Sequence, residues 1–340
     1  MEAGYSAQML MGKQCWVTGG TGFIGRHLVR ALLQQGAQVQ LFCRTPLKAR
    51  ELFGDTVTIV PGDLREPVAI QEAEIVFHLG ATYRFGRGAR REMDAVNVGG
   101  TTNLLQAAWQ ARVAKFVFIS SSSVLANRAG PITENNFPTA VPASQPYRRS
   151  KWLAEKACLE FAARGLPVVI TNPNSPLGPE DEAPTPTGRM IVDFLQKGFP
   201  AAAHTTLNFV DVHELADGLI AAAERGRIGE RYIFAHHNVW LMEFLQLLAR
   251  ITGRPAPRFT APWPLIALGG IFGELTGSDR LCWETAWHCL KRTPFDGRKA
   301  MDELGWQPRV PLEDSARAAI AWFRNPRIPA PPLIEADVAP

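Results

Sequence analysis

Residues 17–25 read VTGGTGFIG, and this stretch decides the fold of the 340-residue chain. The residues before it are apolar, as in a buried strand, and Phe23–Gln35 has the pattern of an amphipathic helix. Glycines let the turn between them approach a phosphate closely, and the helix N-terminus offers free N–H donors and a partial positive charge. The stretch therefore predicts a pyrophosphate site for a dinucleotide. The contacts predicted within it are Gly19, Thr21, Gly22, Phe23 and Ile24.

Composition narrows the class of protein. The chain is 46% hydrophobic and 20% charged, with a formal net charge of +4. No basic block with interleaved aromatics occurs, so nucleic acid is not an expected partner. The five cysteines form no CxxC pair, which argues against a zinc site and a disulfide framework. We expect a cytoplasmic, globular protein without a metal, with residues 1–12 as an N-terminal extension rather than a signal peptide.

Apolar runs and helical patterns alternate through the first half. The expected strands are 14–18, 38–42, 57–60, 75–79, 115–120 and 167–172, and the expected helices are 23–35, 92–111 and 147–164. This order predicts an α/β fold, a Rossmann-type doubly wound parallel sheet, with ligands at the carboxyl ends of the strands. We assign residues 13–175 to this nucleotide-binding domain.

The pattern changes in the second half. Residues 176–324 are expected to form a smaller, mainly helical substrate region, and 325–340 a disordered Pro-rich tail. The expected helices are 191–197, 212–225, 240–252, 278–290 and 312–324, while strands at 207–210 and 231–234 are expected to return to the main sheet. The apolar segment 262–272 is too short to span a bilayer, and a buried helix, a lid over substrate or a patch for peripheral membrane contact stay open.

The end of the second expected strand indicates which dinucleotide binds. An acidic residue there usually holds the ribose of NAD, but this chain has Cys43-Arg44, with Lys48 close by. Arginine can bind a 2′-phosphate through two hydrogen bonds, so NADP (NADPH) is favoured and NAD is the alternative. Arg26 is expected to add charge near the same phosphate. Asp63, before Leu64, either accepts a hydrogen bond from adenine or caps a helix that begins near Glu66.

A tyrosine and a lysine lie one helical turn apart in the predicted helix 147–164. On one helix face, the Lys151 ammonium can stabilise the phenolate of Tyr147, whose reference pKa of about 10 is otherwise too high for a base at neutral pH. Tyr147 could then exchange a proton with a substrate oxygen. Ser120–Ser123 follow the fifth strand, where a hydroxyl can hold the same oxygen. By contrast, His78 is predicted to be a packed core residue, and Asp211 a helix cap.

Together these motifs resemble the extended short-chain dehydrogenase/reductase family, also called the NAD-dependent epimerase/dehydratase superfamily. Within it, the chain is similar to the dihydroflavonol-reductase-like enzymes, and most similar to the group labelled hopanoid-associated sugar epimerase. The motifs that carry the resemblance are TGGTGFIG (18–25), GDL (62–64), HLGA (78–81), NVGGT (97–101), FISSSS (118–123), YRRSK (147–151) and SPLGP (175–179), with LNFVDVHELADG (207–218) in the second half.

The resemblance implies roles for individual residues. It implies that Ser121, Tyr147 and Lys151 are catalytic, with Ser122 as the register alternative to Ser121. Implied cofactor contacts are Asp63, Leu64, Leu79, Gly80, Ala81, Asn97, Pro173 and Ser175, and candidate substrate contacts are Tyr83, Ser122 and Pro176. Many relatives are homodimers, and helices 92–111 and 147–164 would form the interface.

Two enzymatic functions and one binding function follow. The first is an NADP-dependent reductase or dehydrogenase acting on a carbonyl or secondary alcohol of an apolar substrate that is sterol-, hopanoid- or flavonoid-like. The second is a nucleotide-sugar epimerase or dehydratase that retains its cofactor. Ser175 stands where sugar-nucleotide epimerases usually carry asparagine, which favours the first. The third, a non-catalytic NADP-binding regulator, is disfavoured by the complete Ser-Tyr-Lys set.

Overall fold

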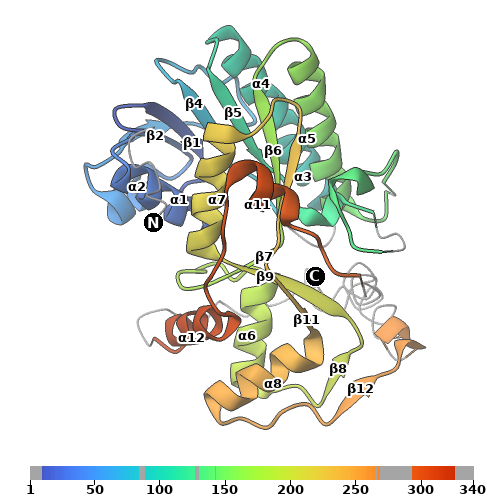
Figure 1. The fold of residues 1–340 in the computed structure, drawn as a ribbon. Coiled ribbons are helices and arrows are strands. Elements are labelled where there is room, and N and C mark those ends of the chain that lie inside the picture. The colour runs from blue at the N-terminus through green and yellow to red at the C-terminus, as the bar shows by residue number, and fades with distance from the viewer. Residues whose placement is uncertain are drawn as a thin grey trace, which may run out of the picture.

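The computed structural model describes residues 10–83, 89–126, 130–141, 143–264, 266–268 and 293–325. Its centre is a seven-stranded sheet in the order β10-β6-β5-β4-β1-β2-β3, in which every pairing is parallel (Figure 1). The strands are β1 (Gln14–Thr18), β2 (Gln38–Cys43), β3 (Thr58–Pro61), β4 (Ile75–His78), β5 (Lys115–Ile119), β6 (Val168–Pro173) and β10 (Arg231–Phe234). The predicted Rossmann-type sheet is confirmed, and the six strands expected in the first half of the chain are shifted by one residue at most.

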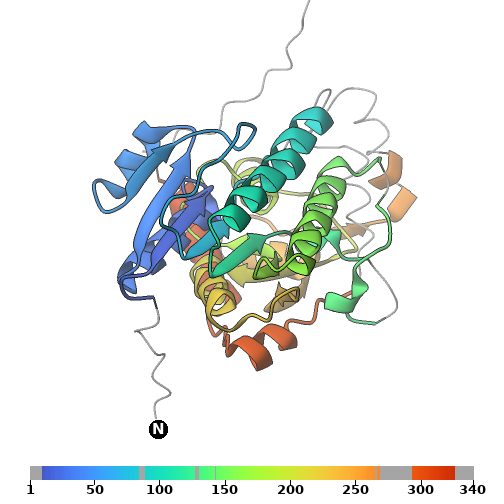
Figure 2. The same cartoon turned by 90° about the horizontal axis from the view of Figure 1, so that it is seen from above.

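Alternate residues of the strands build two hydrophobic cores. In β1, Cys15 and Val17 join one core, and Trp16 joins the other. The first core lies under α1 (Phe23–Gln34), α2 (Pro46–Phe53), α7 (Val212–Arg225) and α11 (Arg298–Leu304), and the second lies under α4 (Gly100–Gln110) and α5 (Pro146–Ala163). Figure 2 shows α4 and α5 side by side on one face, with α7 on the other. Covering both faces explains why the strands are mainly apolar.

The helix expected over 92–111 is not regular. It consists of α3 (Ala89–Met93), a π-helical turn (Asp94–Gly99) and α4. The π turn adds a residue to the helix and places Asn97 where its side chain bonds the backbone of Thr82. Hydrophobic spacing does not reveal such an insertion.

The second region packs below the sheet in Figure 1. It holds a three-stranded sheet, β11-β9-β7, and a two-stranded sheet, β12-β8. Its elements are β7 (Ser175–Leu177), α6 (Pro186–Lys197), β8 (Ala201–Ala203), β9 (Thr206–Asp211), β11 (His237–Trp240), α8 (Leu241–Thr252), β12 (Phe259–Ala261) and α12 (Leu312–Phe323). Helices α6, α8 and α12 share an apolar core with β9, which includes Phe194, Phe209 and Phe244.

One of the two strands expected to join the main sheet from the second half of the chain does not do so. Residues 231–234 form β10 of the main sheet, but 207–210 lie in β9, which pairs with β7 and β11 instead. Leu207 and Phe209 pack in the core of the second region, so this strand is held there. Asp211 caps α7 as predicted, by accepting bonds from the backbone of His213 and Glu214.

Several expectations fall on other parts of the chain. Residues 1–9 of the expected extension, residues 265 and 269–272 of the apolar segment, the helix expected over 278–290 and the tail from 326 lie outside the described residues. Leu10, which was assigned to the extension, is buried in the core beneath α1. Among the described residues, no helix is long and apolar enough to cross a membrane, and no group of side chains forms a metal site.

Candidate active site

The glycine turn lies where the strand order reverses, between β1 and β4. From β1 the chain builds outward to β3, then returns to β4 on the other side. Gly19 has a φ of +71°, and a Cβ on it would come within 2.7 Å of Gly80 N. A Cβ on Gly25 would lie 2.2 Å from Gly19 O. Both glycines are required by this geometry, because a side chain would fill the space beside the turn.

Helix α1 begins at this turn with its donors uncapped. Gly22 is the N-cap and supplies no side-chain acceptor, so the first N–H groups of the helix are left for a ligand. Phe23 and Ile24 form the first turn, and Leu79–Ala81 leave β4 next to it, since Leu79 N donates to Thr18 O. The glycine cradle and the open helix end fit a pyrophosphate, as the sequence predicts.

Lys151 is buried at the carboxyl end of β5. Its Nζ donates to Ile119 O at 2.7 Å and lies 4.6 Å from the centre of the Phe118 ring. Burial lowers the pKa of Lys151 to about 8, although the Glu155 and Cys158 side chains oppose the shift. The ammonium is therefore held directly before the serine-rich turn.

Tyr147 is half-buried in the first turn of α5, which begins with Pro146. Its ring meets that of Tyr83 edge-on, with centroids 4.4 Å apart. Tyr83 is 37% exposed and lies in the segment that follows β4. The contact therefore brings the segment after β4 against the start of α5. Tyr147, Lys151 and Tyr83 thus lie at the same edge of the sheet.

The serine turn has a defined conformation. Ser121 is extended, and its Oγ lies 2.9 Å from Ser123 Oγ and accepts from Ser123 N. Ser122 begins the short 3₁₀ turn Ser122–Val124. The buried Ser120 hydroxyl has no hydrogen-bond partner among the described residues. Ser121 and Ser122 are both partly exposed at this edge, in keeping with either register.

Polar side chains behind α5 form what we call the inner network: Asn97, Ser150, Lys151, Glu155 and Asn172. Asn97 Nδ2 donates to Ser150 Oγ at 2.9 Å, which in turn donates to Tyr147 O. Asn172 Nδ2 donates to both Glu155 Oε1 (2.6 Å) and Ser121 O (3.1 Å). Asn97 and Ser150 thus hold the backbone of Tyr147, and Asn172 holds the backbone of Ser121.

Glu155 was not singled out from the sequence. It is fully buried and accepts from Arg231 Nε of β10 at 2.8 Å. The available signal is its spacing, because Tyr147, Lys151 and Glu155 follow one another at successive turns on one face of α5.

His78 extends the inner network toward the glycine turn. The Thr101 hydroxyl donates its one hydrogen to Asn97 O. Its oxygen therefore accepts a hydrogen bond from His78 Nε2 at 2.9 Å. His78 Nδ1 then accepts from Thr18 Oγ1 at 2.7 Å, and Thr18 accepts from Gly80 N. Burial lowers the pKa of His78 to about 3, which keeps it neutral. The predicted core histidine is confirmed.

Asp63 does not cap a helix. Its carboxylate accepts from the backbone and guanidinium of Arg65, and no helix begins near Glu66. The Arg65 guanidinium lowers the pKa of Asp63, and Arg44 contributes to that shift. The capping alternative is therefore wrong, because the carboxylate closes a turn with Arg65 instead.

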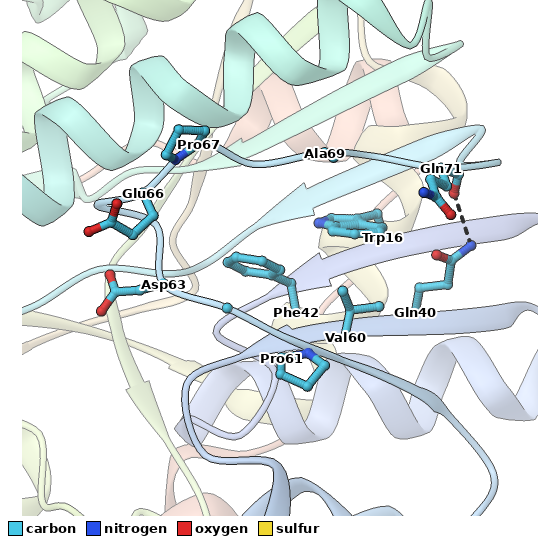
Figure 3. A pocket seen from close by; sticks show the side chains of 11 residues that line it. Trp16, Gln40, Phe42, Val60, Pro61, Asp63, Glu66, Pro67, Ala69 and Gln71 are labelled. Atoms are coloured by element: carbon cyan, nitrogen blue, oxygen red, sulfur yellow. Dashed lines mark hydrogen bonds between the residues drawn. The ribbon is translucent and has the colours of Figure 1, made fainter.

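A groove of about 440 Å³ lies beside Asp63 on the α4 and α5 face of the sheet. Figure 3 shows Trp16, Phe42 and Val60 as its floor, with the segment 67–71 passing above them. Gln40 Nε2 bonds Gln71 O across one end. None of the predicted catalytic residues lines this groove, so it is separate from the edge where Tyr147 lies.

The remaining predicted residues lie around the same edge. Leu64 is buried beneath Gly80, and Pro173 ends β6, two residues before Ser175, which begins β7 with Pro176. Arg44 is exposed just after β2. Lys48 lies in the first turn of α2 and pairs with Glu182, as does Arg26, so both cations already have a carboxylate partner.

Comparison with known proteins gives a consistent result. Residues 15–235 match the model of the NAD dependent epimerase/dehydratase family. A putative dihydroflavonol 4-reductase from Synechocystis sp. is 34% identical over 91% of this chain and 94% of its own length. Sterol demethylase protein B from Methylococcus capsulatus is 35% identical over 91% of this chain and 98% of its own. The solved structure of a nucleoside-diphosphate-sugar epimerase from Pseudomonas aeruginosa is 28% identical, with a TM-score of 0.76 over 92% of this chain and 97% of that one.

Proposed function

This chain belongs to the NAD-dependent epimerase/dehydratase family, whose members are NAD(P)-dependent enzymes, and from that premise we propose that it is an NADP-dependent reductase of apolar carbonyl compounds. In this proposal, Tyr147 is the acid/base, Lys151 sets its charge state, and Ser121 holds the substrate oxygen. Sterol-, hopanoid- or flavonoid-like ketones are the proposed substrates, and the same site would oxidise the corresponding alcohols.

The observation that carries the proposal is the position of Lys151. Its ammonium is fixed by Ile119 O at the end of β5, directly before the serine turn and one helical turn from Tyr147. A buried cation one helical turn from a half-buried phenol can stabilise the phenolate. This arrangement supports proton exchange at a substrate oxygen.

The chemistry divides between the cofactor and the protein. Bound NADPH supplies the hydride that adds to the carbonyl carbon. Tyr147 donates its phenolic proton to the carbonyl oxygen, so the C=O bond becomes a C–OH bond. Ser121 Oγ donates a hydrogen bond to that oxygen as its negative charge grows, and Lys151 stabilises the resulting phenolate.

The preference for NADP rests on Arg44. It is exposed after β2, and among the described residues it makes no ion pair. The nearby Asp63 is already engaged by Arg65, so it offers little competition for this guanidinium. A free arginine at this strand end can take a 2′-phosphate through charge-assisted hydrogen bonds.

The apolar substrate class rests on the relatives and on Ser175. Two relatives that match over nine-tenths of the chain are named as a putative dihydroflavonol 4-reductase and as a sterol demethylase protein. Tyr83, Ser122 and Pro176 are the proposed substrate contacts at the edge near Tyr147. Ser175 offers a hydroxyl where a sugar-nucleotide enzyme would use a carboxamide.

A panel of steroid, hopanoid and flavanonol ketones tests the proposal, with NADPH oxidation as the readout. We expect turnover of at least one apolar ketone, with one NADPH consumed for each alcohol formed. The competing function is a nucleotide-sugar epimerase, which the Pseudomonas aeruginosa structure favours. Such an enzyme would instead isomerise UDP-sugars, keep its NAD(P) cofactor bound and show no net oxidation of NADPH.

We also propose a homodimer formed through α4 and α5. These helices pack together on one face of the sheet, and Trp109 near the end of α4 is 39% exposed. Light scattering after size-exclusion chromatography is expected to give twice the mass of the chain, and Trp109→Lys is expected to give the single mass.

A further inference from the structure

The loop between β7 and α6, residues 178–185, carries two glutamates to the nucleotide-binding helices. Glu182 Oε2 lies 2.8 Å from Arg26 Nη2 of α1 and 2.8 Å from Lys48 Nζ of α2. Glu180 pairs with Arg30 at 2.7 Å and with Arg26 Nη1 at 3.6 Å, and both partners belong to α1. Only Glu182 reaches α2 in these ion pairs of the described residues.

The two cations that Glu182 holds differ in mobility. The Arg26 side chain is 4% exposed and also donates to Thr21 O, so it is fixed against the glycine turn. The Lys48 side chain is 37% exposed and lies in the first turn of α2, four residues after Arg44. Lys48 can therefore change partners, whereas Arg26 cannot.

We propose that Glu182 determines how strongly the enzyme prefers a 2′-phosphorylated cofactor, because its carboxylate occupies Lys48 in place of the phosphate. This inference rests on the proposed NADP site. A carboxylate and a phosphate accept the same charge-assisted bonds from an ammonium group. A 2′-phosphate bound at Arg44 must either draw Lys48 away from Glu182 or bind without a contact to Lys48.

The charge balance sets the direction of the effect. With Glu182 ionised, Lys48 and Arg26 share a negative partner, and part of their attraction for a phosphate is cancelled. The hydrogen bonds from Lys48 and Arg26 lower the pKa of Glu182, which keeps the carboxylate charged at neutral pH. A neutral residue at this position leaves Lys48 available and strengthens the binding of the 2′-phosphate alone.

Calorimetric titration of the full chain with 2′-phospho-ADP-ribose and with ADP-ribose tests this without any turnover. Glu182→Gln is expected to tighten the binding of 2′-phospho-ADP-ribose by about fivefold, the scale of a partly exposed ion pair. Binding of ADP-ribose is expected to change by less than about twofold. Glu180→Gln is the matched control, because Glu180 lies on the same loop but does not touch Lys48, and it should leave the ratio of the two affinities unchanged.

A double-mutant comparison shows whether Glu182 acts through Lys48. In a Lys48→Met background, Glu182→Gln is expected to give no further gain for 2′-phospho-ADP-ribose. Glu182→Asp, which keeps the charge but shortens the reach to Lys48, provides a second variant in case Glu182→Gln does not fold, and it should shift the ratio in the same direction.

The proposal is overturned when folded Glu182 variants leave the ratio unchanged, or when the gain persists without Lys48. Its failure is distinct from failure of the proposed function. A wild-type protein that binds ADP-ribose more tightly, with no response to Arg44→Ser, contradicts the NADP preference. A selective gain from Glu182→Gln supports the role of Glu182 in either case.

Discussion

The inner network behind α5 and the charges around Glu182 differ in burial and in freedom. In the inner network, Asn97, Lys151 and Glu155 are buried, and each has a fixed hydrogen-bond partner. Around Glu182, Lys48 and Glu182 itself remain 37% and 46% exposed. Buried polar groups are costly to leave without partners, so the first set fixes geometry. Exposed charges exchange partners at little cost, so the second set suits ligand selection.

The largest expected effect comes from removing the proton donor that the inner network positions. Tyr147→Phe is expected to lower kcat/KM for NADPH-dependent ketone reduction by about 100-fold or more, since general acid catalysis is lost. NADPH affinity, measured by fluorescence titration, should change little because the ring remains. A variant that keeps most of its activity would show that the inner network holds α5 for another purpose.

Breaking the inner network at Glu155 is expected to cost stability as well as activity. Glu155→Gln leaves Arg231 without its carboxylate in a buried site and is expected to destabilise the protein by about 3 kcal/mol. The matched control is Glu160→Gln on the exposed side of α5, for which a change within about 0.5 kcal/mol is expected. Urea unfolding of both variants measures the difference. Equal effects would mean that burial does not distinguish this network.

Acid should affect the inner network through His78. The pKa of His78 is lowered from 6.5 to about 3 by burial, so below pH 6.5 the unfolded chain binds a proton that the folded chain does not. Stability therefore falls as the pH falls, by about 2 kcal/mol from this residue between pH 7 and pH 5. Urea unfolding at the two pH values should show a smaller decrease for His78→Gln than for the wild type. Parallel decreases would assign the acid sensitivity to other groups.

The smallest expected effect concerns the exposed charges. Arg44→Ser is expected to weaken NADPH binding by about tenfold and to leave NADH binding nearly unchanged, since only the 2′-phosphate loses a partner. Fluorescence titration with the two nucleotides measures the ratio. A parallel loss for both would place Arg44 at a part that the nucleotides share.

The sequence predicted most of the main sheet and of the site around Tyr147. It predicted little of the second region and of the charges around Glu182. Strands such as Ile75–His78 could be predicted because they are buried on both faces, so apolar runs mark them directly. The glycine turn could be predicted because its close contacts leave no room for a side chain. The start of α6 was predicted at residue 191, but the helix begins at Pro186. Proline was expected to interrupt a helix, although it is favourable in the first turn after an N-cap such as Thr185.

The contacts that were missed join segments far apart in the sequence. Glu182 meets Lys48 only because the loop after β7 folds back over α1, and no local pattern encodes that path. The same holds for β9, whose sheet is decided by its partners rather than by its own composition. Glu155 is the exception, since its helical spacing from Lys151 was visible in the sequence.

Isotope tracing tests the central claim most directly. In a single turnover with NADPH deuterated on carbon 4 of the nicotinamide, the account predicts deuterium on the carbinol carbon of the alcohol product formed from an apolar ketone, with transfer slowed by about 100-fold or more in Tyr147→Phe. Deuterium that stays on the nucleotide with every apolar ketone, while a UDP-sugar is isomerised, would contradict it.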